Sequence, residues 1–210
     1  RLIPLGFADG VTELCNGVMI FLFNRVILRC LGDDGLVCYT IIAYVNTLII
    51  NTMLGISQGS QPLVSYHYGK EDAAGYRKLL RYGAAAVGIM TAVIFAGVMV
   101  FAPQIAGIFL GAEKPWLVTD AAGALRRYGL CYLLLGGNIL MGGFLTAVER
   151  PKAAISISVG RGLAFQAGAL VLLAAAVGGN AIWYAPVISE ALCAGMAAVF
   201  LSGFLRKTMK

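Results

Sequence analysis

Charged residues are scarce in this sequence. Asp, Glu, Lys and Arg make up 12% of the 210 residues, whereas a soluble domain carries roughly 25%. Hydrophobic residues make up 60% of the chain, and the mean hydropathy is +0.84. This composition excludes an ordinary soluble domain, and with it a soluble nucleic-acid-binding protein, although the net charge is +6. The chain is therefore predicted to lie in a membrane.

Histidine and paired cysteines are scarce as well. His67 is the only histidine, and the five cysteines are an odd number without a CxxC pair. Neither a disulfide framework nor a metal site is expected, because cysteines inside apolar stretches behave as small hydrophobic residues. No Ser/His/Asp, Cys/His or metal-ligand grouping converges on one membrane face, so we expect neither an enzyme nor a cofactor.

Long apolar stretches are abundant. Each reaches the roughly 17 to 25 residues that a helix needs to cross a hydrocarbon core of about 30 Å. They predict an all-α polytopic membrane protein with six transmembrane helices, over residues 2–31, 36–68, 82–101, 125–148, 153–177 and 181–205. Between the second and third stretches, residues 70–81 are predicted to form either a short amphipathic helix on the membrane surface or a solvated loop.

The basic residues favour one side of the membrane. If the amino end is cytoplasmic, the inner segments hold most of them, and the reverse orientation violates the positive-inside rule. We therefore expect both ends of this segment to be cytoplasmic and the protein to lie in the plasma membrane. The outer segments hold only Arg25, Arg29, Lys114, Arg126 and Arg127.

Polar side chains form a single stripe along the second stretch. On an ideal helix they fall within about 60° of one another. An amide in hydrocarbon costs several kcal/mol without a partner or water, so such a stripe should face protein or a wet cavity. With the nearby Gln61, these residues are candidates for the lining of a transport pathway: Thr40, Thr47, Asn51, Gln58 and Ser65.

The first stretch has a polar face of its own, about 80° wide, formed by Asp9, Glu13, Asn16 and Asn24. Two carboxyls one turn apart repel each other, and poor hydration favours a bound proton on one of them. Such a group can load and release H⁺, or lose its proton and bind Na⁺. The alternative is that the helix begins late, with Asp9, or Asp9 and Glu13, at the inner surface as helix-start acids. Asn24 is a candidate pathway-lining residue.

Three further polar residues lie at membrane depth. Glu190 follows Pro186 in the sixth stretch, and Arg161 lies about two turns into the fifth. We expect structural or supporting roles for both, with Arg161 either paired to an acid or directed toward the headgroups. Asn138 either lines the pathway or bonds a neighbouring helix.

The sequence resembles the multidrug and toxic compound extrusion (MATE) transporters. The main match is residues 55–69, GISQGSQPLVSYHYG, which is similar to the signature that closes the second helix of the family's carboxyl-terminal lobe. Thr12-Glu13-Leu14, Phe23-Asn24, Ile182-Trp183 and Ala185-Pro186 with Glu190 also match. The resemblance implies one six-helix lobe of a two-lobe transporter. Since the first residue is Arg1, we expect a fragment without its amino-terminal lobe.

The resemblance also implies a function. Such transporters export organic, often cationic drugs in exchange for Na⁺ or H⁺. Another branch of the family has an acid at the position that matches Asn16, so we predict Glu13, one turn earlier, as the coupling group, assisted by Asp9 and Asn16. The expected partners are the bilayer, the drugs and the missing lobe. Two alternatives stay open: a lipid-linked precursor flippase of related fold, and a membrane subunit that transports nothing itself.

Overall fold

The computed structural model describes residues 2–111 and 114–207, with side chains for Leu14 and for residues 17–111 and 114–204. The predicted all-α class is confirmed. The elements in chain order are α1 (Leu2–Gly69), α2 (Ala73–Leu110), α3 (Pro115–Gly129), α4 (Tyr132–Ala147), α5 (Pro151–Val159), the π-helical η1 (Gly160–Ala164), α6 (Phe165–Ala176), the 3₁₀-helical η2 (Gly179–Tyr184) and α7 (Ala185–Lys207).

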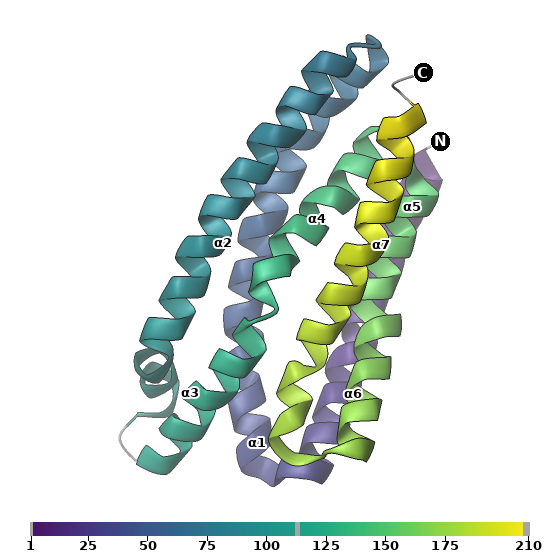
Figure 1. The fold of residues 1–210 in the computed structure, drawn as a ribbon. Coiled ribbons are helices and arrows are strands. Elements are labelled where there is room, and N and C mark those ends of the chain that lie inside the picture. Colours follow the sequence, from purple (N-terminus) through teal and green to yellow (C-terminus); the bar gives the residue numbers. More distant parts are fainter. Residues whose placement is uncertain (1, 112–113, 208–210) are drawn as a thin grey trace.

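The chain passes up and down through an elongated bundle, and its two ends lie at the same end of that bundle (Figure 1). Helix α1 makes two of the passes, because Gly32 leaves helical geometry at φ 71° and ψ −162° and the chain reverses there. By length and apolar composition four helices qualify as membrane spans within the described residues, or five if α3 and α4, bent by 44°, count as one. That count takes the two passes of α1 as a single helix.

Helix α2 is longer than the apolar stretch that predicted it. The sequence placed the third span over 82–101, whereas α2 begins at Ala73 and ends at Leu110. The segment over 70–81 is therefore mostly the start of α2, neither a separate surface helix nor a loop. The reason is packing, because Tyr76 is buried against Phe144 and Phe204, from distant parts of the chain.

Helix α4 lies at the centre of the packing and contacts α1, α2, α5 and α7. Glycines permit this close approach. A Cβ atom at Gly136 would lie 2.7 Å from a methyl group of Val87, and one at Gly143 would overlap the Ser57 hydroxyl. Small residues allow helix backbones to approach within a membrane, where the hydrophobic effect between helices is weak. The position of α4 therefore depends on its glycines.

The α1–α2 connection is closed by a polar cap. The Asp72 carboxylate accepts a hydrogen bond from the Gly75 amide at 2.9 Å and contacts Nδ1 of His67 at 2.8 Å. The Gly75 amide and then His67 lower the pKa of Asp72 below its usual range. An aspartate at this position satisfies an amide that the helix leaves unpaired, and so fixes where α2 begins.

The reversal at Gly32 gives a test of the two-pass geometry of α1. Its backbone angles are accessible almost only to glycine, so Gly32→Ala should destabilise the protein by about 1 to 3 kcal/mol. Gly55→Ala is the control, since Gly55 lies in the helix with open space around a new Cβ. The measurement is the free energy of unfolding in mixed micelles. Equal stability of the two variants would contradict the geometry.

Candidate functional site: an exposed polar stripe and a buried ion pair

The polar stripe lies on the outside of the bundle. Thr40, Thr47, Asn51, Gln58 and Ser65 are all exposed on the second pass of α1. The opposite face of the same pass forms the core, with buried residues that include Ile42, Ile49 and Met53. The stripe therefore points away from the core of this bundle, except at Ser65, whose hydroxyl donates to the carbonyl of Ala147 in α4 at 3.1 Å.

The hydroxyl groups of the stripe are satisfied by backbone carbonyls. Thr40 donates to the carbonyl of Leu36 at 3.0 Å and Thr47 to that of Ala43 at 2.9 Å. The side-chain amides of Asn51 and Gln58 form no hydrogen bond with any part of the chain that the structure describes. An amide at membrane depth needs water or a polar partner. The surface formed by these two amides therefore calls for a partner outside this lobe.

An apolar groove borders the stripe. It has a volume of about 400 Å³ and lies between the second pass of α1 and the helix α2. Tyr44 and Leu48 contribute its α1 wall, and the ring of Tyr44 stacks on that of Phe109, with centroids 5.9 Å apart. An apolar hollow and a polar stripe thus lie side by side on the outer surface of the bundle.

The other predicted site residues are distributed differently. Asn24 is half-buried on the first pass of α1, and Gln61 is half-buried, with its side chain directed at Gly143 of α4. Asp9, Glu13 and Asn16 belong to α1, but their side chains lie outside the described residues. Their proposed part in ion coupling stays a prediction.

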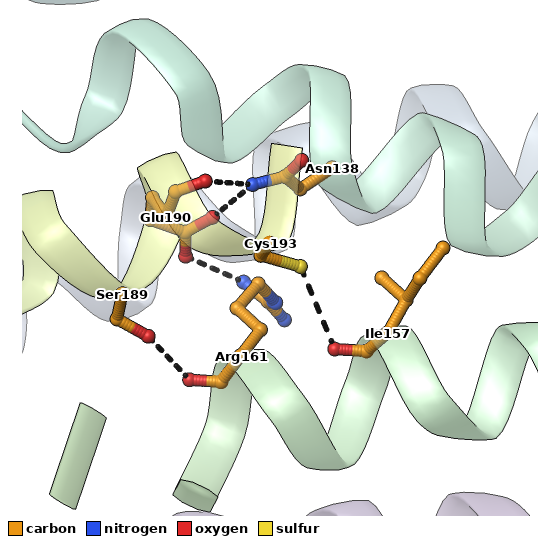
Figure 2. A network of polar contacts seen from close by, with 6 residues as sticks. All are labelled: Asn138, Ile157, Arg161, Ser189, Glu190 and Cys193. Atoms are coloured by element: carbon orange, nitrogen blue, oxygen red, sulfur yellow. Dashed lines mark hydrogen bonds and ion pairs between the residues drawn. The ribbon is translucent and has the colours of Figure 1, made fainter. Parts of the chain in front are cut away.

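A separate polar cluster is buried between α4, η1 and α7 (Figure 2). The Asn138 side-chain amide donates to Oε2 of Glu190 at 2.6 Å and to the Glu190 carbonyl at 2.9 Å. Nη1 of Arg161 lies 3.5 Å from Oε1 of Glu190. The Glu190 carboxylate is thus held on one oxygen by an amide and on the other by a cation, which are the contacts that a buried charge requires.

The backbone around Arg161 forms a π-helical turn, and contacts with α7 hold it in place. Arg161 lies in the π-helical η1, where the Phe165 amide bonds the carbonyl of Gly160. The widened turn leaves the Arg161 carbonyl to accept a hydrogen bond from the Ser189 hydroxyl at 3.2 Å. One turn earlier, the Cys193 thiol contacts the Ile157 carbonyl at 3.7 Å. These contacts hold α7 against α5 and η1 on both sides of Glu190 (Figure 2).

Sequence reasoning left the surroundings of Asn138 and Arg161 open, and the structure brings both to Glu190. It also shows residues that the sequence did not single out. Ser57 is buried on α1 and donates to the carbonyl of Ile139 at 3.3 Å, and Ser189 bonds the π-helical turn. The glycine pairs 136–137 and 142–143 of α4 were the available signal for the role of Ser57. Glycines let two helices approach closely, and a serine hydroxyl on one helix can then reach a backbone carbonyl of the other.

The fold, with its apolar passes and its polar residues at membrane depth, is that of a multi-pass membrane protein. The MatE family model matches residues 10–164. The chain therefore belongs to the MatE family, whose members are transporters rather than enzymes. A search of curated proteins found no match.

Solved structures support this assignment at the level of the fold. A MOP superfamily transporter from Pyrococcus furiosus, with a binding pocket described as reversed in polarity, is 18% identical with a TM-score of 0.91, over 99% of this chain and 47% of that one. An outward-facing multidrug resistance MATE family transporter of that superfamily is 20% identical with a TM-score of 0.87, over 97% and 45%. An inward-facing conformation of such a transporter gives the same identity and TM-score, over 96% and 46%. The chain spans about half the length of these transporters.

A double-mutant cycle tests the buried ion pair. Arg161→Leu leaves the Glu190 carboxylate without its cation, and loss of one partner of a buried pair costs about 3 to 5 kcal/mol. The double variant Arg161→Leu/Glu190→Gln should be more stable than Arg161→Leu alone, because no unpaired charge remains. Free energies of unfolding of the four proteins give the coupling. Strictly additive effects would show that the two side chains do not interact.

Proposed function

We propose that this chain is the carboxyl-terminal lobe of a secondary active antiporter. The complete transporter would export organic, often cationic compounds across the plasma membrane in exchange for Na⁺ or H⁺. The observation that carries the proposal is the polar stripe of α1, which faces away from the core of its own lobe. A second lobe placed opposite that stripe would enclose an aqueous cleft between the two.

The stripe and the groove beside it suit an amphipathic substrate. Asn51 and Gln58 offer amide donors and acceptors to water or to polar parts of a compound. The groove next to them, lined by Tyr44, Leu48 and apolar residues of α2, suits hydrocarbon and aromatic parts. Binding sites for small molecules commonly combine a mostly apolar wall with a few polar groups that fix orientation.

Coupling is assigned to Glu13, with Asp9 and Asn16 assisting. A carboxylate at membrane depth that gains or loses a cation changes the local charge, and so biases which side of the membrane the cleft faces. Outward-facing and inward-facing conformations of similar transporters support alternating access as the mechanism. Rocking of one lobe against the other would use the bundle described here as a rigid unit.

Efflux by the complete gene product tests the coupling role. Glu13→Gln should abolish ion-driven efflux while leaving the protein inserted, because the amide can neither take up a proton nor balance a cation. The measurement is efflux of a cationic fluorescent dye from cells that lack their own drug exporters, with the sodium or the proton gradient imposed separately. The amount of protein in the membrane is quantified in parallel.

Glu149→Gln is the matched control. Glu149 is exposed in the turn between α4 and α5, far along the chain from the proposed coupling site, and its loss should leave efflux unchanged. Undiminished efflux by the Glu13 variant would reject the coupling role. Efflux of an anionic dye in preference to the cationic one would reject the proposed substrate class. Such a result would instead resemble the Pyrococcus furiosus transporter, whose binding pocket is described as reversed in polarity.

A further inference from the structure

A second hollow lies at the end of the bundle where the chain begins and ends. It has a volume of about 210 Å³ and is formed by the end of α4, the start of α5 and the last turns of α7. Its wall is apolar except for one side chain, that of Arg150. The lining residues are Leu145, Arg150, Ala153, Val199, Phe200, Gly203 and Phe204. We call it the α5–α7 groove.

The groove opens on the outside of the bundle. Val199 is 68% exposed on its α7 side. Gly203 has open space where a Cβ atom would lie, so the absence of a side chain there keeps the hollow accessible. An apolar hollow that opens on the outside of a membrane bundle is accessible to hydrocarbon chains rather than to water.

Arg150 places a positive charge at the mouth of this hollow. Its guanidinium carbon lies 5.7 Å from the centroid of the Phe204 ring. Phe204 is itself held by ring contacts with Tyr76 and Phe144. Because these rings pack against one another, the Phe204 ring gives the guanidinium a well-packed surface to lie on. Among the described residues Arg150 forms no ion pair, and its side chain is exposed.

The surroundings of Arg150 favour an anion. The turn over residues 149–152 contains the acid Glu149 and the two bases Arg150 and Lys152, all exposed. An arginine offers several donors in a fork that matches the oxygens of a phosphate group. The amino end of α5 adds a weak positive potential at this point.

From this combination we infer that the α5–α7 groove binds an anionic phospholipid of the adjacent leaflet. The phosphate lies against Arg150, and one acyl chain lies in the apolar hollow between Ala153, Val199 and Gly203. Basic pockets between helices at the membrane surface are the general setting for recognition of acidic headgroups. The apolar wall selects a lipid over a soluble phosphate, since only a lipid fills both parts of the site.

Lipid binding to the purified, complete transporter tests the site. Dioleoyl phosphatidylglycerol is titrated into detergent micelles, and bound lipid is counted by native mass spectrometry, with dioleoyl phosphatidylcholine and inorganic phosphate in separate arms. Arg150→Gln should weaken phosphatidylglycerol binding about tenfold through loss of the charge-assisted contact. Gly203→Leu should weaken it similarly by filling the hollow. Neither change disturbs a backbone hydrogen bond, and thermal unfolding verifies that both variants fold.

Arg81→Gln is the matched control, because Arg81 is an exposed base on the first turns of α2 and does not line the groove. It should bind phosphatidylglycerol within about twofold of the unchanged protein. The proposal is overturned by normal binding in either groove variant, by an equal loss in Arg81→Gln, by equal binding of phosphatidylcholine, or by displacement with inorganic phosphate. Dye efflux plays no part in this measurement, so its result is independent of the transport proposal.

Discussion

The structure depends on one constraint, which is that a polar group at membrane depth must have a partner. The described lobe meets this constraint within itself at Glu190, where Asn138 and Arg161 each hold one carboxylate oxygen. At Asn51 and Gln58, which lie exposed on the outer face of α1, the lobe offers no such partner among the described residues. The contrast separates two kinds of polar residue. One kind joins helices of the lobe, and the other is available to something beyond it.

The internal cluster explains how the lobe can act as one body. The contacts of Glu190, Ser189 and Cys193 join α7 to α4, α5 and η1. The glycines of α4 allow that helix to pack closely on α1 and α2. A unit held in this way suits the proposed rocking of one lobe against another, because such a motion leaves the core of each lobe unchanged.

Part of this account could be predicted from the sequence and part could not. Periodicity along one helix predicted the stripe, because Thr40 to Ser65 share a face whatever the helix packs against. Contacts between distant segments were beyond such reasoning. The burial of Tyr76, which extends α2 to Ala73, depends on Phe144 and Phe204, and the pairing of Asn138 with Glu190 depends on how α4 crosses α7. The side chain of Glu13 lies outside the described residues, so its role rests on sequence alone.

We propose that the stripe of α1 faces water inside the membrane. Single cysteines at Asn51 and Gln58, in the complete transporter with its native cysteines replaced, test it through reaction with a hydrophilic thiol reagent in intact membranes. A cysteine at Val93, which is 64% exposed on the apolar surface of α2, is the reference for a position in lipid. The account predicts that both stripe positions react and that position 93 does not. Stripe cysteines as unreactive as the one at position 93 would contradict it.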